Sequence, residues 1–299
     1  MHAAAHVVPS DLPRLALRGR ATSKRDYGRV VIVGGATGMA GAPALAGMAA
    51  AKSGAGLVEI LVPDVVATIT AGFDPCLMTR GLPSGPDGTF ASTAGPLLEE
   101  RLTAATVVAI GPGMGRSAAV AAIVHGLWRD LPQPAVFDAD ALWAIAQMEP
   151  SRPAHHAGPR VLTPHTGEML RLLGSDAQSP QASSRGWLEA RATEIAATID
   201  AIMVLKGPGT LVTDGTRQVH NETGNPGMAT GGTGDVLTGM IAALLAQGLS
   251  PFDAARLGAW IHGRAGDLAA ATIGEISMTA RDLLDHLPTA FRAVVQSDA

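Results

Sequence analysis

The chain contains 299 residues, and 26 acidic against 22 basic side chains give it a formal charge of −4. Hydrophobic residues make up 47% and charged residues 16% of the chain, which excludes an intrinsically disordered protein. The slightly acidic balance argues against a nucleic-acid groove, which requires clustered Lys and Arg. No apolar run approaches the roughly 18 residues of a membrane helix, and residues 1–20 lack the apolar centre of a signal peptide. We therefore expect a soluble, cytoplasmic protein with no membrane or nucleic-acid partner.

The cysteine and glycine contents further limit the class of protein. The single cysteine, Cys76, excludes an internal disulfide and a multi-cysteine zinc site, and we expect it to pack in the core or against a helix. The chain has 36 Gly and 20 Pro residues but only four Trp, one Tyr and five Phe. This composition indicates a fold that brings backbone close to a ligand at several places.

Elements are predicted in chain order from hydrophobic periodicity. Residues 1–27 read as an irregular lead-in, and 28–299 as one domain. Turn residues predict a surface loop at 81–88. The predicted strands are 30–33, 57–61, 107–110, 135–137, 161–162, 202–205, 211–213 and 219–222. The predicted helices are 42–53, 118–128, 166–173, 187–199, 235–246, 251–271 and 280–295. Strands that alternate with helices predict a single α/β domain with a mostly parallel sheet covered on both faces.

Polar side chains follow several of these strands. Asp138, His165 and Lys206 each come directly, or within three residues, after a predicted strand. Ligands of open α/β sheets bind beyond the carboxyl ends of the strands. We therefore expect these residues to share one rim of the sheet.

The most informative segment is residues 225–235, Asn-Pro-Gly-Met-Ala-Thr-Gly-Gly-Thr-Gly-Asp, which leads into an apolar helix. Unpaired N–H groups at a helix start suit an anion, and glycines let the backbone approach phosphate closely. Asp235 would repel a phosphate but fits a base that removes a proton from an attacking hydroxyl. The alternative is an ordinary helix N-terminus, where Asp is common.

Neither standard phosphate fingerprint is present. The chain contains no G-x-x-x-x-G-K-[ST] sequence, and Gly35, Gly38 and Gly41 have the wrong spacing for G-x-G-x-x-G. This first glycine run is compatible with a tight turn between a strand and a helix. The chain is therefore not a P-loop protein.

The glycine-rich segments together resemble one family. Gly-Thr-Gly-Asp at the start of a late helix resembles the ribokinase superfamily, and the full ordered set is similar to the ADP-dependent NAD(P)H-hydrate dehydratases. The resemblance covers about residue 24 to the end. The set comprises Gly-Gly-Ala-Thr-Gly-Met (34–39), Ser-Gly-Ala-Gly-Leu-Val (53–58), Gly-Pro-Gly-Met-Gly (111–115), Asp-Ala-Asp-Ala-Leu (138–142), Thr-Pro-His (163–165), Lys-Gly-Pro-Gly-Thr (206–210) and residues 225–235.

The resemblance implies a three-layer α/β/α ribokinase-like fold and a repair reaction. The family phosphorylates the hydroxyl of NADHX or NADPHX, the hydrates of NADH and NADPH, with ADP and then eliminates phosphate. Mg²⁺ is the implied cofactor, and we expect a homo-oligomer, with a tetramer as one form. Some members carry an N-terminal epimerase domain, for which this chain leaves no room, so a separate NAD(P)H-hydrate epimerase is the expected partner.

Residue roles follow from the resemblance one position at a time. Asp235 is the catalytic base and also contacts substrate. The implied substrate-binding residues are Ala42, Gly113, Gly115 and His165. The implied nucleotide-binding residues are Lys206, Gly207, Pro208, Gly209, Thr210, Gly232, Thr233 and Gly234. The implied metal residues, acting directly or through water, are Asp138, Asp140 and Glu168; Glu168 follows His165 with the spacing of the superfamily's N-x-x-E element.

Alternatives remain for individual residues and for the whole chain. His165 and Asp140 are also suited to capping helix starts, and the Lys206 segment is also a plain hairpin turn. A small-molecule kinase of the thiazole or hydroxymethylpyrimidine type would use the same Gly-Thr-Gly-Asp chemistry. A third alternative is a nucleotide-binding protein without catalytic activity, but the presence of Asp235 argues against it.

Overall fold

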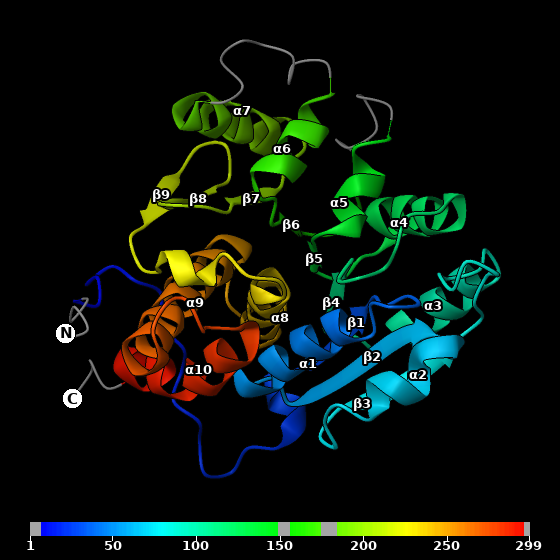
Figure 1. Ribbon diagram of the computed structural model, residues 1–299, viewed down its shortest axis with the longest axis horizontal. Coiled ribbons are helices and arrows are strands. Elements are labelled where there is room, and N and C mark those ends of the chain that lie inside the picture. The colour runs from blue at the N-terminus through cyan, green and yellow to red at the C-terminus, as the bar shows by residue number, and fades with distance from the viewer. Residues whose placement is uncertain (1–6, 149–155, 175–183, 296–299) are drawn as a thin grey trace.

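The computed structural model describes residues 7–148, 156–174 and 184–295. Among these residues, nine strands form one sheet in the order β3-β2-β1-β4-β5-β6-β7-β8-β9 (Figure 1). Neighbours from β3 to β7 are parallel, whereas the β7–β8 and β8–β9 pairs are antiparallel. The strands are β1 Arg29–Val33, β2 Leu57–Pro63, β3 Met78–Leu82, β4 Val107–Ile110, β5 Ala135–Phe137, β6 Arg160–Leu162, β7 Ile202–Leu205, β8 Thr210–Thr213 and β9 Gln218–Asn221.

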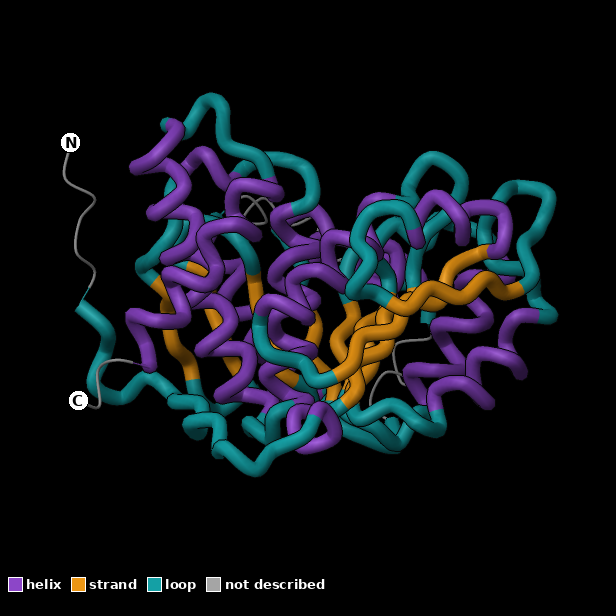
Figure 2. Tube along the Cα trace, turned by 90° about the horizontal axis from the view of Figure 1, so that it is seen from below, coloured by secondary structure: helices purple, strands orange, loops and turns teal. Residues whose placement is uncertain are grey.

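Helices cover both faces of the sheet, as Figures 1 and 2 show. The helices are α1 Gly41–Lys52, α2 Asp64–Ala71, α3 Ala94–Leu102, α4 Ala118–Asp130, α5 Asp140–Ile145, α6 Thr166–Leu173, α7 Arg185–Thr198, α8 Thr233–Ala246, α9 Pro251–Ile273 and α10 Ala280–Val295. Alternate strand residues point to opposite faces. Val30 and Ile32 pack with α1, α2, α8, α9 and α10, whereas Val31 and Val33 pack with α3 to α7. The predicted three-layer architecture with a mostly parallel sheet is confirmed.

The predicted elements are confirmed to within two residues at each end, but four strands and α-helices of the described chain were not predicted. These are β3, α2, α3 and α5. The predicted surface loop at 81–88 is wrong at its start, because Gly81 and Leu82 close β3. Strand β3 lies at the edge of the sheet, and of its residues only Leu82 is buried. A strand so exposed has no apolar pattern by which to recognise it.

The expectation for Cys76 is also wrong. Its side chain is exposed in the connection between α2 and β3. The nearby Asp74 carboxylate, which accepts a hydrogen bond from the thiol, raises the pKa of Cys76 above its ordinary value. This thiol therefore contributes nothing to the core.

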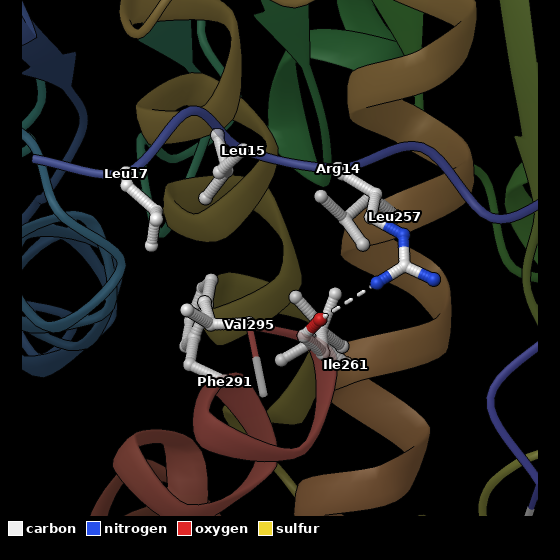
Figure 3. Close-up of a pocket in the computed structure, with 8 residues that line it drawn as sticks. Arg14, Leu15, Leu17, Leu257, Ile261, Phe291 and Val295 are labelled. Atoms are coloured by element: carbon white, nitrogen blue, oxygen red, sulfur yellow. Dashed lines mark hydrogen bonds between the residues drawn. The ribbon is translucent and has the colours of Figure 1, made fainter. Parts of the chain in front are cut away.

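The described part of the lead-in packs on α9 and α10. Residues 7–23 contain no helix or strand, and a 3₁₀ helix follows at Lys24–Tyr27. Arg14 Nη1 donates to the Val294 carbonyl oxygen at 3.3 Å, and Arg256 on α9 forms an ion pair with Asp11. Figure 3 shows the cavity beneath this segment, whose volume of about 20 Å³ holds little more than one water molecule. It is too small for an organic ligand.

Two helices bring distant loops together at the carboxyl edge of the sheet. Helix α1 packs against α8 so closely that a Cβ atom on Gly239 would overlap the Ala46 carbonyl oxygen. Near the start of both helices, Leu45 Cδ1 lies 2.7 Å from the position of a Cβ atom on Gly232. The loop before α8 therefore lies beside the first turns of α1.

In the described ranges, no helix has both the length and the apolar character needed to cross a bilayer.

Candidate active site

The predicted shared rim is confirmed by the contacts of Lys206. This residue follows β7, and its Nζ lies 2.8 Å from Asp138 Oδ1, just beyond β5. The same ammonium lies 3.8 Å from Oε2 of Glu168, near the start of α6. Residues that follow three neighbouring parallel strands, β5, β6 and β7, therefore meet at the carboxyl ends of these strands.

Lys206 is charged in this setting. Burial of its ammonium works to lower the pKa, but the charges of Asp138, Glu168 and Asp235 and the hydrogen bond to Asp138 outweigh burial. The pKa of Lys206 is therefore above its ordinary value. The turn that follows joins β7 to β8 and is closed by Thr210 Oγ1, which donates to the Gly207 carbonyl oxygen at 3.0 Å. The predicted hairpin is confirmed.

The glycine-rich loop ends where α8 begins, two residues earlier than predicted. Gly232 is the N-cap and has φ = 93°, a left-handed conformation that favours glycine. Thr233 Oγ1 donates to the carbonyl oxygens of Met228 and Thr230, and His262 Nε2 donates to the Thr233 carbonyl oxygen at 2.8 Å. The hydrogen bonds of Thr233 and His262 thus hold the end of the loop in place. The N–H groups of the first helical turn have no partner within the helix.

Asp235 lies in this first turn, next to the Lys206 cluster. Burial, together with the charges of Asp138, Asp140 and Glu168, raises the pKa of Asp235 to about 8, although Lys206 works in the opposite direction. Lys206 Nζ lies 3.2 Å, and Asp138 Oδ2 3.7 Å, from where a Cβ atom on Gly234 would be. A side chain at 234 would therefore crowd the space between the helix start and the cluster. A carboxylate with a raised pKa at such a site is suited to accept a proton.

The three carboxylates predicted near a metal already have partners. Asp138 accepts from Lys206 and, through Oδ2, from Thr238 Oγ1 at 2.7 Å. Asp140 begins α5, but its oxygens accept from the Gly115 N–H and from Arg116 Nε, both at 2.9 Å, so it does not cap the helix. Within the described chain, no three His, Cys, Asp or Glu side chains converge as a metal site.

His165 caps α6. Its Nδ1 accepts from the backbone N–H groups of Gly167 and Glu168, and Glu168 Oε2 accepts from the His165 N–H at 2.8 Å. The cap that the alternative expected is therefore present. Because Nδ1 accepts, a neutral ring has its proton on Nε2. The side chain remains more than half exposed, and its Nε2 lies 3.5 Å from Glu168 Oε1.

Two of the predicted substrate residues, Ala42 and Gly113, lie together. Gly113 follows β4 with φ = 58°, and a Cβ atom there would lie 3.0 Å from Ala42 Cβ and 2.8 Å from the Met39 carbonyl oxygen. Gly115 is tied to Asp140, as described above. The structure therefore joins Ala42 with Gly113, and Gly115 with Asp140.

Several residues that shape the site were not predicted. Thr238 was recognisable as a polar residue within an otherwise apolar helix, one turn after Asp235. Asp267 on α9 accepts from the Gly224 N–H and from Asn225 Nδ2, both at 3.0 Å, and so anchors the start of the glycine-rich loop. Nothing in the sequence near Asp267 signals this contact.

With this geometry in place, the family is clear. A model of the NAD(P)H-hydrate dehydratase family matches residues 30–289. The chain belongs to the NAD(P)H-hydrate dehydratase family.

Known members of the family are similar over most of this chain. The bifunctional NAD(P)H-hydrate repair enzyme of Moorella thermoacetica is 48% identical over 284 residues, which are 95% of this chain but 52% of that enzyme. The chain thus spans about half the length of the first curated relatives that it matches. The ADP-dependent (S)-NAD(P)H-hydrate dehydratase of Neisseria meningitidis is 37% identical and is matched over 90% of this chain and 89% of its own length.

Solved structures show the same family fold. The ADP/ATP-dependent NAD(P)H-hydrate dehydratase of Bacillus subtilis, crystallised with ATP and Mg²⁺, has a TM-score of 0.76 and 28% identity, covering 93% of this chain and 94% of its own. Arabidopsis thaliana ribokinase has a TM-score of 0.56 and 13% identity, covering 89% and 99%, and is similar in fold alone. The expected ribokinase-like fold is confirmed.

Proposed function

We propose that this chain catalyses the ADP-dependent dehydration of the (6S)-hydrates of NADH and NADPH, releasing AMP and phosphate. The observation that supports it most is the position of Asp235, a carboxylate of raised pKa in the first turn of α8 beside Lys206. Family membership and the names of the relatives from Neisseria meningitidis and Bacillus subtilis point to the same reaction.

Asp235 would act as the base in the first step. It takes the proton of the substrate hydroxyl as the hydroxyl oxygen bonds to the β-phosphorus of ADP. The bond from that phosphorus to the AMP oxygen breaks. The amides of Gly232, Thr233 and Gly234 and the Lys206 ammonium then offset the charge on the transferring phosphoryl group. The remaining nucleotide-binding positions are in the turn at 206–210.

The second step needs little from the protein. The lone pair of the ring nitrogen expels phosphate from the neighbouring carbon, and a proton leaves the adjacent ring carbon to restore the dihydropyridine. Ala42, Gly113, Gly115 and His165 are the proposed substrate-binding residues. His165 Nε2 would donate a hydrogen bond to a substrate oxygen.

Mg²⁺ is proposed as the metal that accompanies the nucleotide. The nearby donors are all carboxylates, which suits Mg²⁺, but each already accepts a hydrogen bond from protein. Asp138, Asp140 and Glu168 would therefore hold a hydrated ion through its water molecules rather than directly. When bound, the ion offsets negative charge on the phosphates.

We propose further that the chain acts in the cytoplasm as a homo-oligomer. A separate NAD(P)H-hydrate epimerase would supply the (6S)-hydrate. Relatives named as bifunctional repair enzymes support a link to a second activity.

The test is recovery of the near-ultraviolet absorbance of NADH from its hydrate, with ADP and ATP assayed side by side. Recovery that requires a nucleotide, and that is faster with ADP, is expected. A phosphorylated hydrate that accumulates without recovery would instead indicate a kinase.

A further inference from the structure

The guanidinium of Arg185 contacts the backbone of the turn between β7 and β8. Arg185 is the first residue of α7. Its Nη1 donates to the Lys206 carbonyl oxygen at 3.2 Å, and its Nη2 donates to the carbonyl oxygens of Leu205 at 3.0 Å and Gly209 at 3.2 Å. One side chain therefore holds both ends of the turn.

These contacts orient the amides of the turn. In a trans peptide, the carbonyl oxygen and the N–H that follows it point in opposite directions. The described residues contain no cis peptide bond. The N–H groups of Lys206, Gly207 and Thr210 therefore point away from Arg185. The Lys206 N–H agrees with this geometry, because it donates to the Pro164 carbonyl oxygen, just beyond β6, at 2.8 Å.

Gly207 leaves the space that the guanidinium needs. Its φ of 139° is one that favours glycine, and a Cβ atom there would lie 3.1 Å from Arg185 Nη1. A side chain at 207 would therefore shift the guanidinium by a few tenths of an ångström. The glycine of the Lys-Gly-Pro-Gly-Thr segment is thus matched to Arg185.

The Nε edge of the guanidinium is held by a carboxylate. Arg185 Nε donates to Glu189 Oε1 at 2.8 Å, one turn further along α7, and Glu189 Oε2 lies 3.2 Å from His220 Nε2 on β9. Burial works to raise the pKa of Glu189, but hydrogen bonds from His220 and Arg185 outweigh it and lower the pKa. The guanidinium is therefore fixed in one orientation. A lysine ammonium, which is a point charge on a flexible chain, would not reproduce its forked arrangement of N–H donors.

We propose that Arg185 is a positioning residue for nucleotide recognition. It fixes the carbonyl groups of the turn, so that the amides of Gly207 and Thr210 and the Lys206 ammonium are directed at the diphosphate of bound ADP. The inference rests on the proposed function, because it takes ADP as the bound nucleotide. Arg185 does not touch the reacting atoms and acts through the turn alone.

The experiment compares Arg185→Gln and Arg185→Lys with the wild type by calorimetric titration of ADP and by steady-state kinetics. For Arg185→Gln, we expect the Kd and KM for ADP to rise about tenfold, with kcat and the KM for the hydrate within about twofold. Arg185→Lys keeps the positive charge but lacks the forked N–H donors of the guanidinium. It should therefore recover less than half of the ADP affinity that Arg185→Gln loses. Glu189→Gln should raise the Kd for ADP by about two- to threefold.

Arg191 offers a matched control on the same helix. It pairs with Glu194 at 2.7 Å, so Arg191→Gln should bind ADP as the wild type does. Thermal unfolding reports whether each variant is folded, and Arg185→Lys decides the question should Arg185→Gln not fold. Unchanged ADP affinity in a folded Arg185 variant, or a loss confined to kcat, overturns the proposal. A wild-type chain that does not bind ADP overturns the proposed function itself.

Discussion

Thr238 Oγ1 donates a 2.7 Å hydrogen bond to Asp138 Oδ2 and so joins α8 to the end of β5 across 100 residues of sequence. Both side chains are buried. The other carboxylate oxygen of Asp138 accepts from Lys206, so the helix that begins at the glycine-rich loop is tied to the strand that leads into the turn at 206–210. Asp138 also adds negative charge beside Asp235. Asp138 therefore both ties α8 to the end of β5 and, after burial, contributes most to the raised pKa of Asp235.

Replacing Asp235 with Asn should abolish turnover and leave ADP binding nearly intact. The amide cannot accept the hydroxyl proton, and loss of a general base lowers the rate by about 10²- to 10⁴-fold. Stability should rise, because the Asn has no charge for burial and Asp138 to disfavour. We expect a gain in unfolding free energy of about 1–3 kcal/mol, allowing for partial exposure. Initial rates, ADP titration and urea unfolding provide the three readouts.

Asp253 supplies the control for that variant. It occupies the first turn of α9, as Asp235 does in α8, and its backbone N–H bonds to Ser250 Oγ. Asp253→Asn removes the same charge from the same helical position, and its rate should match the wild type. An Asp235→Asn variant with more than about a third of the wild-type rate would show that Asp235 is not the base.

Gly232→Val should impair both nucleotide binding and rate. The residue has φ = 93°, and a Cβ atom would lie 2.7 Å from Leu45 Cδ1 and 3.0 Å from Ala280 Cβ. A β-branched side chain resists that conformation and would displace the loop from α1. Gly274→Ala is the control, because Gly274 has a similar φ of 81° with no heavy atom within 4 Å. If Gly232→Val bound ADP as tightly as Gly274→Ala does, the loop would not be the phosphate site.

The protein should lose stability in acid through His262. Burial lowers the pKa of His262 to about 4, although its hydrogen bond to the Thr233 carbonyl works in the opposite direction. The unfolded chain, with a histidine pKa of about 6.5, binds a proton that the folded chain does not, so stability falls as the pH falls from 6.5 to 4. Over this range the wild type should lose about 1–3 kcal/mol more than His262→Gln. Urea unfolding at several pH values measures the difference, and parallel stability curves would exclude this role.

Removal of divalent metal should stop the reaction. Transfer from ADP leaves negative charge on AMP and on the moving phosphoryl group, and Lys206 is the one cation whose contacts reach Asp138 and Glu168 in the described site. Assays with excess EDTA, followed by added Mg²⁺, should show loss and recovery of activity. Full activity in EDTA would show that the reaction does not require Mg²⁺.

Most of the sheet was predictable because its central strands are buried on both faces. Runs such as Val30 to Val33 are apolar throughout, a pattern typical of parallel strands. The missed α2 has the sequence Asp-Val-Val-Ala-Thr-Ile-Thr-Ala, whose β-branched residues disfavour a helix locally. Packing of Val66 and Thr70 against the core overrides that tendency. Local sequence cannot reveal this.

The candidate site was predictable where the residue type itself is unusual. Glycines before α8, and a lysine directly after β7, stand out from the sequence. Arg185 and Asp267 act through long-range contacts to backbone, and such contacts leave no local pattern. The sequence also left open whether His165 caps a helix, which only the distances to Gly167 and Glu168 decide.

The most direct test of the central claim is the product balance of one reaction containing ADP and NADH hydrate. If Asp235 deprotonates the substrate hydroxyl and phosphate is then expelled, each turnover consumes one ADP. AMP, inorganic phosphate and NADH, quantified together, should then appear in a ratio of about one to one to one. A phosphorylated hydrate that accumulates, or NADH recovered without matching AMP and phosphate, would contradict the mechanism.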